Sequence, residues 1–261
     1  MKLIEKNILD FKMYLDQDDE GINQELIETG THEKASIDFI KTILRPDMNV
    51  IELGANIGFY VFIEASIVNH VYAIEPVKYN FEILTKNIEL NRFKNILTYR
   101  LAVGGNNGKI KIHTSNRCNW ATIVPENERA KEYAQLWNNF EKGEEEVPLY
   151  TLDKFTEEFN IGKIDLIRMD VEGAEVDIIP KGLLTLQNMP KNSYLFVEVH
   201  GSCITNKEKV GKMIDIIEAS GFKVIKAVTR KSIALNIKNM ADLRDKLMTM
   251  GACPQVFFNK E

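Results

Sequence analysis

Glycines and a carboxylate lie close together just after the first expected strand, Asn49–Leu53. The segment from Glu52 to Gly58 reads Glu-Leu-Gly-Ala-Asn-Ile-Gly. Gly54 allows a tight turn, and Gly58 allows a helix to pack closely on the strand. Asn56 replaces the second glycine of the dinucleotide fingerprint, and the sequence has no Gly-x-x-x-x-Gly-Lys loop. The segment is therefore suited to a ligand that comes close to the backbone but carries no pyrophosphate.

A second carboxylate, Glu75, follows the next expected strand, Val71–Ile74, about 20 residues after Gly54. An acid at this spacing holds the ribose diol of a nucleotide ligand. S-adenosylmethionine has a ribose and positive groups but no phosphate, so its sulfonium and ammonium suit a carboxylate such as Glu52. We expect this cofactor to contact Glu52, Gly54, Ala55, Asn56, Gly58, Glu75 and Asp170. The alternative is that the glycines only shape a turn and that Glu75 is a surface acid.

Acidic residues also follow the expected strand Ile164–Met169, namely Asp170, Glu172 and Glu175. Carboxylates at one strand end repel one another unless a cation lies near them. A sulfonium, a metal ion or Arg168 could supply that charge. The alternative is that these acids cap the following helix and interact with its dipole. The cluster therefore indicates either a cation-binding site or a helix N-terminus.

His200 stands just past another expected strand, Tyr194–Val199. A neutral hydroxyl is a poor nucleophile, and a base that removes its proton would assist a transfer to it. His200 and Asp170 are the two candidates for that base, and we predict Asp170, Glu172 and His200 as the catalytic residues. A histidine bonded to backbone is the alternative for His200. A metal site formed by these three residues is an open alternative, but they lack the spacing of a metal-ligand motif, so we assign no metal ligands and leave the need for a divalent metal open.

The elements expected to position these residues alternate between strand and helix from residue 49 onwards. This order predicts a doubly wound α/β fold with a mainly parallel sheet, whose ligands bind at the carboxyl ends of the strands. We expect residues 1–48 to pack on the domain formed by residues 49–261, with a helix over His32–Leu44 that begins at the cap Thr31. Ile96–Val103 is expected to form a single strand.

Residues 114–147 interrupt the alternation and are too long for an ordinary connection. A helix over Glu126–Phe140 is expected there, followed by the acidic run Glu144–Glu146. We interpret the segment as an insertion that caps the acceptor side of the crevice. Trp120 and Trp137 offer apolar contacts to an acceptor, although packing in the core is the other interpretation.

The composition excludes several classes of protein. The 261 residues are 44% hydrophobic and 27% charged, with a net charge of −5, as in an ordinary globular protein. Three cysteines without a Cys-x-x-Cys pair argue against a zinc knuckle, a redox pair and a disulfide scaffold. No apolar run approaches the roughly 20 residues of a membrane span, and the first residues lack the apolar core of a signal peptide. We therefore expect a cytoplasmic protein without membrane contact.

Four stretches of the chain resemble the FkbM family of S-adenosylmethionine-dependent methyltransferases. The most specific is Ile164–Glu175, with its Asp-Val-Glu-Gly-Ala-Glu block. Glu52–Gly58 is similar to the family's Asp-x-Gly-Ala-Asn-x-Gly with glutamate in place of aspartate, and Pro148–Asp153 and Leu195–His200 also agree with the family. The resemblance implies a Rossmann-like class I fold with seven strands, the last antiparallel, and S-adenosylmethionine as cofactor. It also implies a hydroxyl of a sugar or small metabolite as methyl acceptor.

The sequence leaves two other functions open. The basic stretch with Lys223, Lys226, Arg230 and Lys231 has no intervening acid, which would suit an RNA (tRNA or rRNA) methyltransferase that contacts phosphates. Against this hypothesis, residues 1–200 are acidic overall and contain no recognisable RNA-binding module. A non-catalytic nucleotide-binding or scaffold protein is the third hypothesis, because fold alone does not establish activity. The identity of the acceptor and the oligomeric state stay open.

Overall fold

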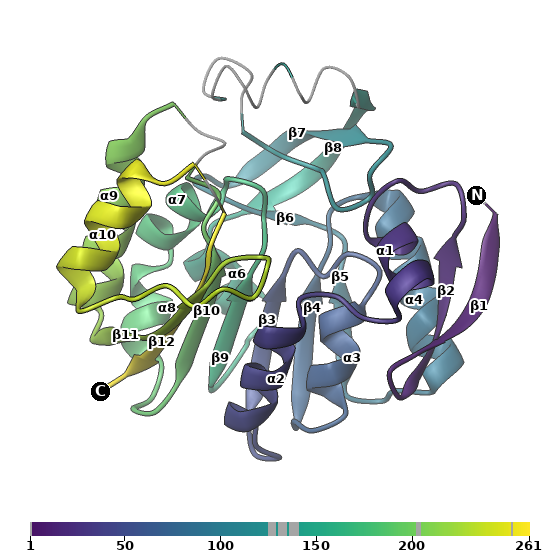
Figure 1. The fold of residues 1–261 in the computed structure, drawn as a ribbon, viewed down its shortest axis with the longest axis horizontal. Helices are drawn as coiled ribbons and strands as arrows, with labels where there is room; N and C mark the ends of the chain where they lie inside the picture. Colours follow the sequence, from purple (N-terminus) through teal and green to yellow (C-terminus); the bar gives the residue numbers. More distant parts are fainter. Residues whose placement is uncertain (1, 125–128, 130–134, 136–140, 202–204, 252) are drawn as a thin grey trace.

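A seven-stranded sheet in the order β11-β12-β10-β9-β3-β4-β5 runs through the molecule (Figure 1). The computed structural model describes residues 2–124, 129, 135, 141–201, 205–251 and 253–261. Neighbouring strands are parallel except at β12, which is antiparallel to β10 and β11. The predicted α/β fold with an antiparallel last strand is confirmed. The strands are β3 (Asn49–Leu53), β4 (His70–Ile74), β5 (Ile96–Tyr99), β9 (Leu166–Met169), β10 (Tyr194–Glu198), β11 (Phe222–Val228) and β12 (Gln255–Lys260).

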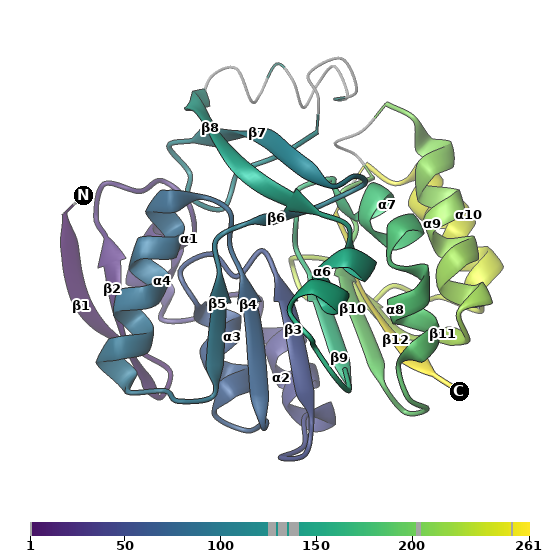
Figure 2. The same cartoon turned by 180° about the vertical axis from the view of Figure 1, so that it is seen from behind.

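The central strands are apolar on both faces, and helices cover both. In β3, Val50 belongs to one apolar cluster and Ile51 to the other, and Leu166 and Ile167 of β9 divide in the same way. Successive side chains of a strand point to opposite faces, so such runs require burial on both sides. The helices α1 to α4 share the first cluster and α6 to α10 the second (Figures 1 and 2). Their bounds are α1 (Ile22–Thr29), α2 (Lys34–Ile43), α3 (Phe59–Ala65), α4 (Lys78–Asn91), α6 (Leu152–Glu158), α7 (Glu175–Ile178), α8 (Leu183–Asn188), α9 (Lys207–Ala219) and α10 (Met240–Thr249).

The order of the strands reverses between β3 and β9. From β3 the chain adds β4 and β5 on one side, and later it adds β9 and β10 on the other. The connections after β3 and β9 therefore diverge and leave a crevice at the carboxyl ends of these strands. Leu53 at the end of β3 pairs with Ile74 of β4 and with Met169 of β9. The polar residues that follow these three strands consequently begin at the same level of the sheet.

The N-terminal residues form a hairpin of β1 (Leu3–Ile8) and β2 (Phe11–Asp16) that packs on α4. The side chain of Asn87 in α4 accepts the backbone N–H of Tyr14 at 2.6 Å and donates to the backbone carbonyl of Ile57 at 3.0 Å. The hairpin is thereby tied to the start of α3, close to the crevice.

The helix expected over His32–Leu44 forms as α2, but the prediction of Thr31 as its N-cap is wrong. The residue before α2 is Glu33, which has a φ of +47° and makes no side-chain cap. Its carboxylate instead accepts a hydrogen bond from the hydroxyl of Tyr60 at 2.9 Å. A buried tertiary contact has therefore decided where this helix begins.

The stretch Ile96–Val103, predicted as one strand, is two strands in different sheets. β5 ends at Tyr99, and β6 (Ala102–Val103) belongs to a three-stranded sheet with β7 (Gly108–Ser115) and β8 (Glu141–Tyr150). This small sheet lies across the carboxyl ends of the parallel strands (Figure 2). The helix expected over Glu126–Phe140 lies almost entirely outside the described residues and stays a prediction. The expected boundary between residues 1–48 and a domain of residues 49–261 also stays a prediction. Among the described residues, no helix is both long and apolar enough to span a membrane.

Candidate functional site

A cleft opens at the carboxyl ends of β3, β4 and β9, bordered by the small sheet. The space within it, part of which is open to solvent, amounts to about 950 Å³. Most of the site residues predicted from the sequence line this cleft: Glu52, Gly54, Ala55, Asn56, Glu75, Asp170 and Glu172. The fold therefore brings together residues that lie at or just after the ends of β3, β4 and β9.

Two predicted site residues, Gly58 and His200, do not contribute to the lining of this cleft as the structure describes it. Gly58 precedes α3 with a φ of +102°, and a Cβ there would lie 2.7 Å from Phe62 and 2.8 Å from Leu84. Its missing side chain therefore serves the packing of α3 against α4. His200 is fully buried behind Asp170.

At Gly54 the backbone makes a close approach to the loop after β9. Gly54 has a φ of +85°, and a Cβ there would lie 2.0 Å from the carbonyl oxygen of Asp170. The backbone N–H groups of Gly54 and Ala55 both donate to the carbonyl of Ile74, at 3.0 and 2.9 Å. Any larger residue would separate the ends of β3 and β9, so the closeness of these loops depends on glycine.

Glu75 closes the cleft beside β4 and is 4% exposed. Its carboxylate accepts the backbone N–H of Asn56 at 2.8 Å and that of Val77 at 2.9 Å. Burial raises the pKa of this carboxyl group to about 7, although those hydrogen bonds act to lower it. A carboxylate has about four acceptor positions, so it can hold both loop N–H groups and still accept from a diol.

The segment after β7 forms another wall of the cleft. The side chains of Asn56 and Asn80 both donate to the carbonyl of Cys118, at 3.2 and 2.7 Å. The residues of this wall are Cys118, Asn119, Ala121 and Ile123. The described part of the predicted insertion therefore borders the cleft. Trp120 lines a neighbouring cavity instead, and Trp137 lies outside the described residues.

Arg168 lies at the floor of the cleft inside a cluster of buried charges. Its guanidinium is 3% exposed, hydrogen-bonds to Glu52, and lies 3.5 Å from Asp170 Oδ2 and 3.9 Å from Glu33 Oε2. It also stacks over the ring of Tyr60, with 3.5 Å between the guanidinium carbon and the ring centroid. Burial raises the pKa of Glu52 to about 7, and the positive charge of Arg168 opposes that rise. Arg168 therefore both orients Asp170 and balances part of the negative charge.

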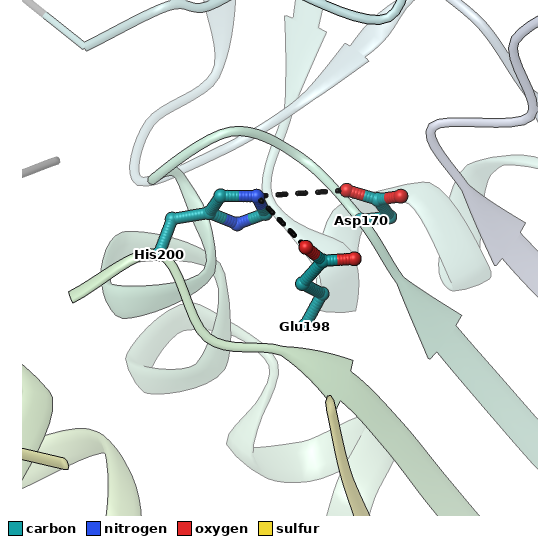
Figure 3. Close-up of side chains that lie close together, drawn as sticks. All are labelled: Asp170, Glu198 and His200. Atoms are coloured by element: carbon teal, nitrogen blue, oxygen red, sulfur yellow. Dashed lines mark ion pairs between the residues drawn. The ribbon is translucent and has the colours of Figure 1, made fainter. Parts of the chain in front are cut away.

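His200 lies behind Asp170 and is 1% exposed (Figure 3). Its Nε2 is 3.7 Å from a carboxylate oxygen of each of Asp170, Glu172 and Glu198, and its Nδ1 is 3.6 Å from Glu175. Burial favours the neutral ring, but the charges of Glu172 and Glu175 outweigh burial and raise the pKa of His200 well above its usual value. Because His200 is buried and does not line the cleft as described, whereas Asp170 does, the geometry favours Asp170 over His200 as the base.

Sequence reasoning missed Glu198 and Arg230. The guanidinium of Arg230 hydrogen-bonds to Glu198 and lies 4.0 Å from Glu172 Oε1. Glu198 and His200 stand two residues apart at the end of β10, where the alternation of a strand places both side chains on one face, and this pattern could have identified Glu198. No sequence signal pointed to His32, which also lines the cleft.

Comparisons with known proteins identify relatives of this chain. Residues 52–224 match the family described as the methyltransferase FkbM domain. A relative, 2-O-methyltransferase NoeI of Sinorhizobium fredii (strain NBRC 101917 / NGR234), is 26% identical over 189 residues, which cover 69% of this chain and 72% of the relative.

Two solved structures share the fold. The putative transferase PH0793 from Pyrococcus horikoshii superimposes with a TM-score of 0.51 at 14% identity, over 100% of this chain and 73% of that one. The tRNA m1G37 methyltransferase of M. jannaschii gives a TM-score of 0.51 at 11% identity, over 100% of this chain and 57% of that one. At such low identities these two structures show a common fold and nothing further.

Proposed function

The chain belongs to the FkbM family of methyltransferases, and we propose that it transfers the methyl group of S-adenosylmethionine to a hydroxyl of a sugar or small metabolite. The family and the Rossmann-like class I fold predicted from the sequence are confirmed. The observation that carries the proposal is the cleft at the carboxyl ends of the strands, where the Gly54 turn, Glu75 and Asp170 meet.

The charges around the cleft suit a cationic cofactor. Four carboxyl groups line the cleft, Glu52, Glu75, Asp170 and Glu172, against three basic side chains, His32, Arg168 and Arg230. Such surroundings favour a positive ligand. In this proposal Glu75 holds the ribose diol, while Gly54 and Ala55 offer backbone beside the methionine part. When bound, the cofactor supplies an electrophilic methyl group.

A hydroxyl acceptor is supported by the residues on the acceptor side of the cleft. The relative NoeI is named a 2-O-methyltransferase, which supports an oxygen acceptor for this chain. Asp170 lines the cleft with a side chain that is 25% exposed, and it can accept the hydroxyl proton as the oxygen attacks. Apolar side chains of Ile22, Phe59 and Ile112 exclude water from the same cleft.

The basic stretch that suggested an RNA substrate makes contacts within the protein. Lys223 pairs with Glu218 at 2.8 Å, and the ammonium of Lys226 lies 4.4 Å from the centroid of the Phe39 ring. Arg230 pairs with the carboxylates behind the cleft. Contacts with RNA phosphates would have to replace these interactions, so we favour a small acceptor over RNA.

The proposed function predicts where a labelled methyl group goes. Incubation with methyl-labelled S-adenosylmethionine and a fractionated cell extract should label the oligosaccharide and small-metabolite fraction. The RNA fraction should stay unlabelled, and binding to RNA should be weak at physiological salt. Labelling of RNA, together with an affinity that falls steeply as salt increases, would instead establish the RNA function.

We expect Glu75→Ala to weaken S-adenosylmethionine binding about 5- to 150-fold, which corresponds to about 1–3 kcal/mol for a lost charge-assisted hydrogen bond. Titration calorimetry measures the affinity directly. Glu145→Ala is a matched control, because Glu145 also accepts a backbone N–H, that of Lys78, but lies outside the cleft. Equal affinities for Glu75→Ala and the wild type would remove Glu75 from the cofactor site.

The pKa of Glu75, about 7, adds a second readout. Between pH 6 and pH 8 this carboxyl loses its proton and becomes the better acceptor for a diol. Cofactor affinity should therefore rise over that range in the wild type. The part of the rise that comes from Glu75 should disappear in Glu75→Gln, which keeps the shape of the side chain and one acceptor oxygen.

We also propose that residues 1–48 form a segment that packs on the methyltransferase domain of residues 49–261. Two cleft residues, Ile22 and His32, come from the first segment. Cys118 and Ile123 come from residues 114–147, which supports the interpretation of these residues as an acceptor-side insertion. A cytoplasmic location is part of the same proposal.

A further inference from the structure

Behind the cleft, a buried histidine faces carboxylates that come from two strand ends (Figure 3). His200 Nε2 lies 3.7 Å from Asp170 Oδ1 and 3.7 Å from Glu198 Oε1. Glu172 Oε2 lies at the same distance from Nε2 on another side. Neither ring nitrogen of His200 has a hydrogen-bond partner among the described residues. A buried polar group without a hydrogen bond is rare and indicates a missing partner.

We propose that Asp170, Glu198 and His200 bind a divalent metal ion, with Glu172 beside it. One oxygen of each acid and one nitrogen of His200 lie within 4.8 Å of one another. Ligand atoms that share an ion at bond lengths of about 2.0–2.2 Å lie roughly 3.0–3.6 Å apart. The two distances from His200 Nε2, 3.7 Å each, lie just above this range. The two acid oxygens lie within 4.8 Å of each other, so both acids would move toward a bound ion.

The partners of His200 support a ligand role for its Nε2. Glu175 accepts the backbone N–H of His200 through Oε1 and the backbone N–H of Gly173 at 3.0 Å through Oε2. The same Oε1 lies 3.6 Å from His200 Nδ1. A carboxylate that accepts from the far nitrogen of an imidazole is the usual support of a metal-binding histidine. Glu175 lies just beyond hydrogen-bond distance of Nδ1, while Nε2 faces the acids, so a small shift of the ring would complete this arrangement.

Of the two basic groups beside the acids, Arg168 leaves this position open to an ion, whereas Arg230 has to move aside for an ion to bind. Arg168 approaches Asp170 through Oδ2, whereas Oδ1 faces His200. Arg230 pairs with Glu198 Oε1, the oxygen that also faces His200, but the side chain of Arg230 is 43% exposed and can move into solvent. An ion at this position would take over the role of Arg230 as counter-charge.

The donor set points to a first-row transition ion of the Mn²⁺ type. Carboxylate oxygens suit Mg²⁺, Ca²⁺ and Mn²⁺, whereas imidazole suits transition ions, and Mn²⁺ satisfies both preferences. Asp170 lies far along the chain from Glu198 and His200, which is why no spacing motif revealed the three ligands together.

A role for the ion in catalysis rests on the proposed function. Asp170 belongs both to the ion site and to the cleft lining. An acceptor hydroxyl bound to the ion would have a lowered pKa. As its oxygen forms the new bond to the methyl carbon, the carbon–sulfur bond breaks with its electron pair going to sulfur, and the hydroxyl proton passes to Asp170 Oδ2.

Metal binding is tested without cofactor or acceptor. The full chain is treated with chelator, dialysed and titrated with Mn²⁺, while electron paramagnetic resonance measures the free ion. We expect one bound ion per chain, and a loss of affinity of more than about 100-fold in His200→Gln and Glu198→Gln. Glu175→Gln, which alters the group beside Nδ1 and one of the two backbone hydrogen bonds that Glu175 accepts, should cost about 10- to 100-fold. Asp165→Asn, at the opposite end of β9, is the control that should bind as the wild type does.

Absence of Mn²⁺ binding by the wild type, or equal binding by folded His200→Gln, overturns the site. If a variant fails to fold, the melting temperature of the wild type is measured with and without Mn²⁺ instead. An ion that binds the native state raises that temperature. No rise with Mn²⁺ likewise overturns the site. In the methyl-transfer assay, chelator should lower the rate at least about 10-fold and Mn²⁺ should restore it. Bound Mn²⁺ with a rate that chelator leaves unchanged overturns the catalytic role, whereas failure of the proposed function leaves the binding result intact.

Discussion

Asp170→Asn should reduce methyl transfer by about 10²- to 10⁴-fold, the contribution of a positioned base. Asparagine keeps the size of the side chain but removes the charge that faces Arg168 on one side and His200 on the other. Cofactor affinity should fall as well, because a cationic ligand loses a nearby carboxylate. Initial rates at saturating acceptor and calorimetry of cofactor binding separate the two effects.

The control for this experiment is Asp165→Asn, which alters a more deeply buried acid at the other end of the same strand region. Asp165 accepts the backbone N–H of Asn49 at 3.0 Å and pairs with Lys163 at 2.7 Å, far from the cleft residues. This variant should lose stability while the folded protein keeps its turnover. If Asp170→Asn retains more than about a tenth of the wild-type rate, the base assignment is wrong, and positioning of the acceptor accounts for catalysis.

Arg168→Met should lower the free energy of unfolding at pH 8 by about 3–5 kcal/mol, the usual cost of leaving a buried charge without its partner. Methionine fills the space of the aliphatic part of the side chain but removes the counter-charge of Glu52, Glu33 and Asp170. It also removes the cation that stacks on Tyr60. Urea denaturation followed by circular dichroism measures the change.

The effect of Arg168→Met should depend on pH. The pKa of Glu52 is raised to about 7 even with Arg168 present, and the loss of the guanidinium raises it further. In the folded variant this acid keeps its proton to higher pH than in the unfolded chain, so the variant's stability falls as pH increases from about 5 to 8. The deficit should therefore be smallest near pH 5.

Arg45→Met provides the comparison, because Arg45 is 45% exposed and its pair with Asp47 spans 3.5 Å on the surface. Its stability should stay within about 0.5 kcal/mol of the wild type. An Arg168→Met protein with the same denaturation midpoint as Arg45→Met at pH 8 would show that the buried acids do not depend on Arg168.

Local patterns in the chain were enough to predict the mainly parallel sheet and most of its strands, but not the end of the strand that begins at Ile96. Apolar runs such as Asn49–Leu53 and Leu166–Met169 identify strands buried on both faces, and the polar residues that follow them had to lie at one edge. From these patterns Gly54, Glu75 and Asp170 were correctly expected to lie in the cleft. Such a prediction works because the periodicity of a strand, and the residues that follow it, can be identified within a short segment.

Which charged side chains pair with one another could be seen only in the folded structure. Glu33 was expected inside a helix, but it precedes α2 and its carboxylate accepts a hydrogen bond from Tyr60. Arg230 belongs to a stretch that was interpreted as a basic surface, but it pairs with Glu198. His200, predicted at the reacting centre, lies buried behind it. Such contacts join residues far apart in the chain, and burial makes the cost of an unpaired charge large enough to override local preference. Patterns within short segments therefore identify the edge of the sheet at which the cleft lies. The packing of distant segments determines which side chain forms an ion pair or a hydrogen bond with which other.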